Sequence, residues 1–258
     1  MRNSFALAKK DLMSYMHSWI GVFTMSLFFF ISGLFFVFLV ISYERISVDA
    51  SQTLYQNVQG LGLTRFVYGS FFLNLGAVLI FFVPLLTMRA FAEERRFQTL
   101  ELLFTYPFSD FEVVWGKFLG MVWFFECLML PTISYVALIY WLGGNLDWGP
   151  ILIGYLGFWL LGNAYLSLGL FVSAISENQV VSAIITFSIL VLFWVLDWIS
   201  GVTDGFWAHL LTGFSPLAHY REFTLGILDL SHIVYFIFFH FYFLFLALRV
   251  IETRNWKG

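Results

Sequence analysis

The stretch "WIGVFTMSLFFFISGLFFVFLVIS", residues 19–42, contains neither a charged side chain nor a proline. A helix that crosses the hydrocarbon core of a membrane needs about 20 such residues, because its backbone groups must find their hydrogen bonds inside the segment. The rest of the chain has the same character, with 60% hydrophobic residues, 11% charged residues, 34 phenylalanines and 10 tryptophans. A soluble domain of 258 residues could not bury so much apolar surface, so the composition predicts an all-α, polytopic membrane protein.

Five further stretches are long and apolar enough to cross a membrane, which gives six predicted transmembrane helices in a single domain over residues 1–258. Only Glu177 and Asn178 separate the fourth span from the fifth, so these two spans should form a tight helical hairpin. Pro84 and Pro131 should kink the second and third spans. The predicted spans are residues 19–42, 66–88, 118–142, 150–176, 179–196 and 230–248.

Lysine and arginine are distributed unevenly among the segments that flank the spans. Ten of the 13 lie in residues 1–18, 89–117 and 249–258, and the other three lie in segments on the opposite side. Flanking segments rich in lysine and arginine stay in the cytoplasm, so both termini and residues 89–117 are predicted to be cytoplasmic. The net charge of −3 gives no indication of a nucleic-acid partner, and a single cysteine, Cys127, excludes an intrachain disulfide.

Two of the segments outside the spans have a distinct character. Residues 1–18 are predicted to form an amphipathic helix, which either lies in the membrane interface or acts only as a basic anchor. Its apolar positions are Phe5, Ala8, Leu12, Tyr15 and Met16, and its polar positions are Lys9, Lys10 and Ser14. Residues 197–229 are too apolar for a solvated loop and too often broken by glycine and proline for a span. They are predicted to form an outer re-entrant segment of short half-helices that protein covers.

The stretch "RAFAEERRFQTLELLFTYPFSD", residues 89–110, holds seven of the 29 charged side chains. Residues 90–104 lack glycine and proline and predict a helix of about four turns, charged in its first half and apolar in its second. Pro107 should end this helix, and Ser109 with Glu112 forms a capping-box pattern that predicts the start of the next one. A run of charges is often no more than a solvated face, so the stretch alone allows a simple interfacial helix.

A longer segment, "MRAFAEERRFQTLELLFTYPFSDFEVVWGKFLG" (residues 88–120), resembles the cytoplasmic segment that follows the second span in permease subunits of type-2 ABC exporters. The shared pattern is M-R-x-x-x-E-E-x-x-x-x-T-L-E-L-L-x-x-x-P, followed by G-K. Residues 215–230, "SPLAHYREFTLGILDL", and residues 5–19, "FALAKKDLMSYMHSW", resemble the branch that contains gliding-motility and copper-enzyme-maturation permeases. The chain departs from that branch at residues 17–19, where a Ser-Pro pair is common.

This resemblance implies a permease subunit of an ATP-driven exporter in the plasma (inner) membrane, in which residues 89–117 dock onto a separate ATPase and transmit its motion to the spans. It implies two copies of the ATPase, which carry ATP and Mg²⁺, and a second permease copy or a similar permease, all among membrane lipids. This chain is expected to bind no cofactor itself, because Gly116-Lys117 lacks the glycine-rich loop and the Ser or Thr of a P-loop. It is also expected to bind no nucleic acid. The implied coupling residues are Arg89, Glu93, Glu94, Arg95, Phe97, Thr99, Leu100, Glu101, Phe104 and Pro107.

Three polar side chains lie inside predicted spans. Glu126 is either a functional carboxylate or a protonated or hydrogen-bonded structural glutamate that faces a neighbouring helix, since a charge at the bilayer centre costs about 3 kcal/mol. Asn74 and Asn163 are expected to make hydrogen bonds between helices. Two other classes of function remain open, an intramembrane enzyme and a membrane anchor for a cytoplasmic partner that transports nothing. The sequence has no H-E-x-x-H or G-x-S-x-G motif, so no catalytic or metal-binding residue is predicted.

Overall fold

The computed structural model describes residues 2–52, 62–96, 109–200, 202 and 205–254. Helices make up most of this part of the chain, and it contains no β-strand, which confirms the all-α prediction. Within it, six helical segments are long and apolar enough to cross a membrane, and each overlaps one predicted span. They are Trp19–Val48, Thr64–Arg96, Asp110–Trp141, Trp148–Ile175, Gln179–Ile199 and Leu230–Thr253.

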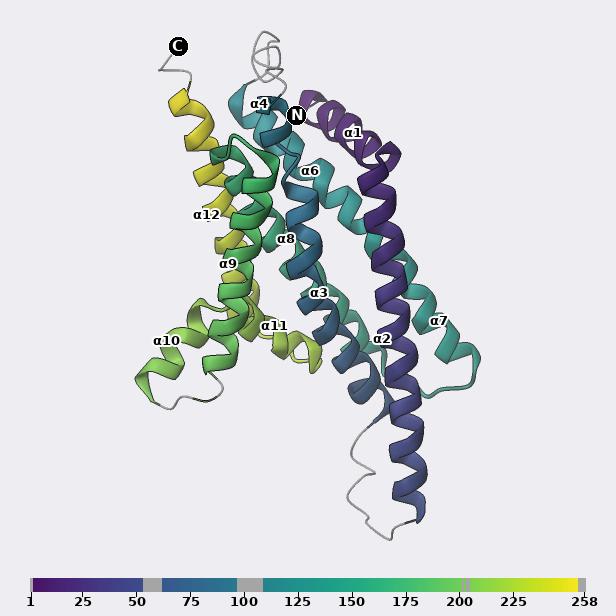
Figure 1. The fold of residues 1–258 in the computed structure, drawn as a ribbon. Coiled ribbons are helices and arrows are strands. Elements are labelled where there is room, and N and C mark those ends of the chain that lie inside the picture. The colour runs from purple at the N-terminus through teal and green to yellow at the C-terminus, as the bar shows by residue number, and fades with distance from the viewer. Residues whose placement is uncertain (1, 53–61, 97–108, 201, 203–204, 255–258) are drawn as a thin grey trace.

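Helices from both ends of the chain meet at one end of the bundle (Figure 1). There, α1 (Arg2–His17) and the last turns of α12 (Leu230–Arg254) lie near α4 (Ala92–Arg96), and we call this the α4 end. After a bend at Ser18, α2 (Trp19–Gln52) runs toward the opposite end along the outside of the bundle. An even number of crossings returns a chain to the side on which it began, so this arrangement agrees with six spans.

The predicted N-terminal helix is present as α1, and its buried side packs on α6 (Asp110–Met129). Two glycines of α6 make the contact close, because a Cβ on Gly116 or Gly120 would lie only 3.0 Å from atoms of α1. Leu7 and Ala8 are buried, whereas the side chain of Phe5 is 53% exposed. Part of the apolar face of α1 is therefore used inside the molecule.

The third span is broken rather than continuous. It consists of α6, a 3₁₀ turn at Leu130–Thr132 and α7 (Ile133–Trp141). Pro131 lies in the turn and has no N–H to continue the α-helical hydrogen bonds, so the helix breaks where the sequence predicts a kink. At the other predicted position, Pro84, α3 continues without a break. At its other end α6 begins at the predicted capping box, where Ser109 accepts a hydrogen bond from the Glu112 N–H at 3.2 Å and the Glu112 carboxylate accepts one from the Ser109 N–H.

The helix α8 (Trp148–Ile175) is the most deeply buried of the six described spans. It packs against α3 (Ser70–Thr87), which follows a π-helical turn at Thr64–Gly69, and against α12. Glycines bring α8 close to its neighbours, since a Cβ on Gly169 would overlap the side chain of Thr87. α8 is therefore the central element of the bundle.

The fourth and fifth spans form the expected tight hairpin, because α8 ends at Ile175 and α9 (Gln179–Ser200) begins three residues after Ser176. The segment predicted as half-helices contains two short helices, α10 (Phe206–Phe214) and α11 (Pro216–Thr224). α11 packs on α8 and α3, and the buried Tyr220 donates a hydrogen bond to the Phe72 carbonyl of α3 at 2.7 Å. Contacts with protein thus cover α11, as a re-entrant segment requires.

Candidate functional site

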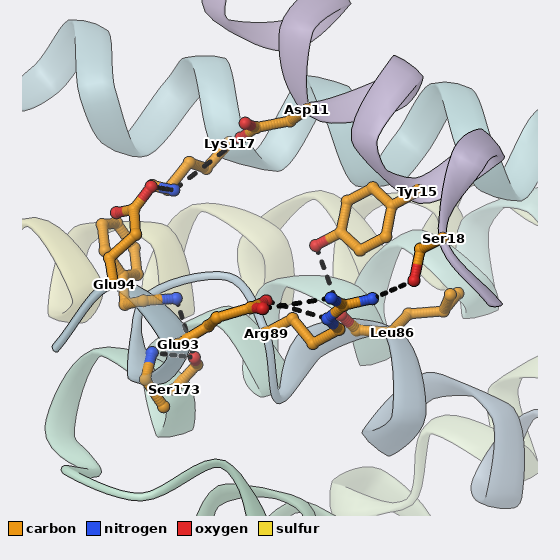
Figure 2. Close-up of polar contacts among 11 residues, drawn as sticks. Asp11, Tyr15, Ser18, Leu86, Arg89, Glu93, Glu94, Lys117 and Ser173 are labelled. Atoms are coloured by element: carbon orange, nitrogen blue, oxygen red, sulfur yellow. Dashed lines mark hydrogen bonds and ion pairs between the residues drawn. The ribbon is translucent and has the colours of Figure 1, made fainter. Parts of the chain in front are cut away.

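Charged and polar side chains gather at the α4 end, where the short helix α4 follows the second span (Figure 2). They come from five parts of the chain, namely α1, the bend at Ser18, the α3–α4 connection with α4 itself, α6 and the end of α8. We call them the α4 cluster, which consists of Asp11, Ser18, Arg89, Glu93, Glu94, Arg95, Lys117 and Ser173.

Arg89 joins α4 to the start of α2. Its guanidinium donates two hydrogen bonds to the Glu93 carboxylate, at 2.8 and 3.0 Å, and a third to the Ser18 hydroxyl. Glu93 is four residues away on α4, whereas Arg89 lies in the turn between α3 and α4, so this bidentate pair links the connection to the helix. The contact with Ser18 fixes the bend between α1 and α2 relative to α4.

Lys117 joins α4 to α6 and α1, and its side chain is only 3% exposed. The ammonium group lies 2.6 Å from a carboxylate oxygen of Glu94 and 3.8 Å from one of Asp11, and it sits over the Phe91 ring at 5.2 Å. A buried ammonium is stable only when opposite charges compensate for its lost hydration, and here two carboxylates do so. The charge of Lys117 therefore holds three helices together.

The end of α8 is tied to α4 by two further contacts. The Ser173 hydroxyl accepts hydrogen bonds from the N–H groups of Phe91 and Ala92, at 3.0 and 3.2 Å. The Arg95 guanidinium donates to the last carbonyls of α8, at 3.0 Å to Ile175 and 3.2 Å to the carbonyl of the next residue, and also to that of Ala174. These carbonyls have no partner within the helix, and a positive charge there also stabilises the helix dipole. α4 is thus fixed to the central helix.

Tyr15 lies beside the cluster and is buried between α1 and α3. Its hydroxyl donates to the Leu86 carbonyl at 3.3 Å, and burial raises the pKa of Tyr15 well above its usual value, so the phenol stays neutral. Next to it is a polar pocket of about 170 Å³ lined by charged residues of the cluster. Among the described residues, no group of three histidine, cysteine, aspartate or glutamate side chains is placed to hold a metal ion.

The structure tests only part of the predicted coupling segment. Arg89, Glu93, Glu94 and Arg95 come together at the α4 end, and each contacts this chain's own residues. Their role toward an ATPase stays a prediction. The remaining coupling residues lie outside the described residues, as does the second half of the predicted helix over 90–104. They are Phe97, Thr99, Leu100, Glu101, Phe104 and Pro107.

Sequence reasoning missed several members of the cluster. The sequence indicates Lys117 as part of the shared G-K pattern and as a cytoplasmic charge, but not as the partner of a carboxylate, and it does not indicate Asp11, Ser18 and Ser173 as partners. A signal was available for Lys117, because a lysine at the edge of an apolar run needs an opposite charge nearby. The identity of that charge depends on tertiary packing.

The three polar residues inside the spans behave differently from one another. The Glu126 carboxylate of α6 accepts a hydrogen bond from the Trp159 indole of α8 at 3.3 Å. The Asn74 amide donates to the Ser70 carbonyl, four residues earlier on the same helix, at 2.8 Å, and the interhelical bond expected for Asn74 stays a prediction. Asn163 is buried on α8, and neither amide atom finds a partner among the described residues.

Six apolar crossings and a charged segment clamped between helices after the second crossing define a multi-pass helical membrane protein with one specialised end. The sequence matches the model of the ABC-2 family transporter proteins over residues 5–251, and the chain belongs to this family. Membership makes it a membrane-spanning permease subunit of an ABC transporter, which works with an ATP-binding subunit. No curated protein matches the chain.

Proposed function

We propose that this chain is the permease subunit of an ATP-driven exporter, in which residues 89–117 receive the motion of a separate ATPase at the α4 end. Two ATPase copies, which carry ATP and Mg²⁺, and a second permease copy or a similar permease complete the transporter. The protein lies in the plasma (inner) membrane with both termini in the cytoplasm. Residues 5–19 and 215–230 favour the branch of gliding-motility and copper-enzyme-maturation permeases.

The observation that supports coupling most directly is the way α4 is fastened to the bundle. Arg95 and Ser173 tie α4 to the end of α8, and Lys117 ties it to α6 and α1. A force applied to the adjoining segment would therefore reach several spans at once, instead of being lost in a loose loop. A solvated interfacial helix would have no need of a buried lysine with two carboxylate partners.

The apolar half of the segment supplies the test of docking. Leu100→Ala should weaken capture of the ATPase more than tenfold, because burying a leucine in a groove contributes about 2 kcal/mol. Leu100→Asp should abolish capture. The measurement is copurification of the ATPase followed by ATP turnover in vesicles, with Leu228→Asp, an exposed leucine in the 197–229 segment, as the matched control. Normal capture and turnover for both Leu100 variants would reduce the segment to an interfacial helix.

The orientation in the membrane has its own test. Single cysteines at positions 52 and 98, introduced as Gln52→Cys and Gln98→Cys in a Cys127→Ala background, should differ in labelling by a membrane-impermeant reagent added to intact cells. The charge distribution predicts that only the cysteine at position 52 is labelled. Equal labelling of both would contradict the proposed topology.

Two other functions make different predictions. A non-transporting anchor would capture the ATPase through the same segment but would move no cargo in vesicles. An intramembrane enzyme would turn over a substrate without any ATPase. ATP-dependent transport by the reconstituted pair separates the exporter from both.

A further inference from the structure

A pocket of about 460 Å³ opens on the side of the bundle between the broken third span and the first half of α8. The break at Pro131 shapes it, because residues on both sides of the 3₁₀ turn, such as Met129 and Ile133, line one wall. The other wall is formed by α8. Several lining side chains are half exposed in the single chain, Leu130 at 62% and Leu152 at 65%, so the pocket is accessible from the surrounding lipid. Its volume is in the usual range for small-molecule sites.

One acidic side chain, Glu126, lines this otherwise apolar pocket. Glu126 lies eight residues after the start of the predicted third span at Phe118, about 12 Å along the helix, which places it well inside the span. Its hydrogen-bond partner is the Trp159 indole, and no cationic side chain pairs with it in the part of the chain that the structure describes. A carboxylate at this depth is costly, so a positive charge brought by a ligand would be stabilised strongly here.

Three aromatic residues of α8 complete the lining: Trp148, Tyr155 and Trp159. Their spacings of seven and four residues place them on one side of the helix. The Tyr155 hydroxyl is already engaged with the Thr132 hydroxyl at 3.1 Å, so Tyr155 contributes mainly its ring. Aromatic rings attract organic cations through the negative charge on their faces, most strongly where water is excluded.

We propose that this pocket binds lipophilic organic cations, with the positive charge near Glu126 and the apolar groups against Leu130, Ile133 and the α8 rings. A neutral lipid would leave the carboxylate uncompensated, and an anion would be repelled by it. A metal ion would find one carboxylate, Glu126, and no other acidic, histidine or cysteine side chain among the described residues that line the pocket. The proposal that the chain binds such cations depends on the pocket alone. The further proposal that these cations are the cargo rests on the proposed exporter function.

The test is a binding measurement on the purified permease in lipid nanodiscs without any ATPase. Tetraphenylphosphonium should bind saturably, as followed by equilibrium dialysis, whereas tetraphenylborate, which has the same shape and the opposite charge, should not. Glu126→Gln should weaken binding of the cation at least tenfold. Glu126→Asp keeps the charge and should retain measurable affinity. The matched control is Glu177→Gln, an exposed glutamate between α8 and α9, which should bind as the wild type does.

Three results would each overturn the inference. They are no saturable cation binding by the wild type, equal binding of the borate anion, and unchanged affinity in Glu126→Gln. Should Glu126→Gln fail to insert, Trp159→Phe takes its place, since it removes the indole but keeps the carboxylate, and it should weaken binding severalfold. Unchanged affinity in Trp159→Phe would then overturn the inference. Because no ATPase is present, these outcomes are independent of the Leu100 test.

Discussion

Replacing Lys117 by methionine should destabilise the protein strongly and should also loosen α4 from the bundle. Methionine has a similar length and fits the space, so the change removes a charge rather than leaving a hole. The carboxylates of Glu94 and Asp11, which lie 2.6 and 3.8 Å from the ammonium, then lose the cation that they share. The substitution therefore removes the ion pairs that join α6 to α4 and α1.

The expected loss of stability in Lys117→Met follows from the burial of the ion pairs that it breaks. Breaking a buried ion pair by removing one partner costs about 3–5 kcal/mol, because the remaining charge is left uncompensated. Glu94 is 20% and Asp11 17% exposed, so water can hydrate both in part, and we expect about 3 kcal/mol. For a chain of this size that corresponds to a fall in Tm of about 6–12 °C.

The assay is thermal unfolding of purified variants in one detergent, with ATP turnover measured alongside. Lys117→Met combined with Glu94→Gln should recover part of the lost Tm, since the second change removes one of the uncompensated carboxylates. Lys9→Met, an exposed lysine on α1, should shift stability by no more than about 0.5 kcal/mol. A Tm of Lys117→Met equal to that of Lys9→Met would refute the reasoning, as would an additive effect in the double variant.

Two more predictions concern packing and pH. Gly169→Ala should lower the free energy of unfolding by about 1–3 kcal/mol, because the new methyl group would overlap Thr87. Gly149→Ala has open space around it and should change Tm little. Equal Tm values for the two variants would contradict the packing described. Burial lowers the pKa of His219 in the folded protein, so the unfolded chain takes up a proton first and stability should fall as the pH drops below about 6.5. His219→Gln should reduce this pH dependence of Tm, and an unchanged slope between pH 7.5 and 5.5 would show that His219 does not cause it.

The six spans could be predicted because each depends on a property of a continuous stretch, its length and its lack of charge. The start of α6 was harder to predict from the apolar pattern alone. The apolar run begins at Phe118, but the capping box at Ser109 marks the true start, and the helix runs on through Lys117. Two separate predictions, a capped helix and a span, thus describe parts of one helix.

Side-chain partners could be predicted only where the sequence brings them near. Arg89 and Glu93 are four residues apart, and they pair as the spacing suggests, although Arg89 lies in the turn that precedes α4. Lys117 and Glu94 belong to different helices, so their contact depends on packing that no local pattern specifies. The sequence predicts a partner for Asn74 on another helix, but in the structure its amide donates to the Ser70 carbonyl. A side-chain amide inside a helix can reach the preceding turn of the same helix.

The central helix α8 connects α4 at one end of the bundle to the pocket beside Glu126. Its last turn is fastened to α4 through Arg95 and Ser173, and its first half carries the rings of Trp148 and Tyr155. A helix of this length measures about 42 Å, so a rigid tilt of about 5° at one end displaces the other by about 3.5 Å. Glycine contacts such as that of Gly169 leave little room for α8 to bend, so a push at α4 would change the width of the pocket beside Glu126.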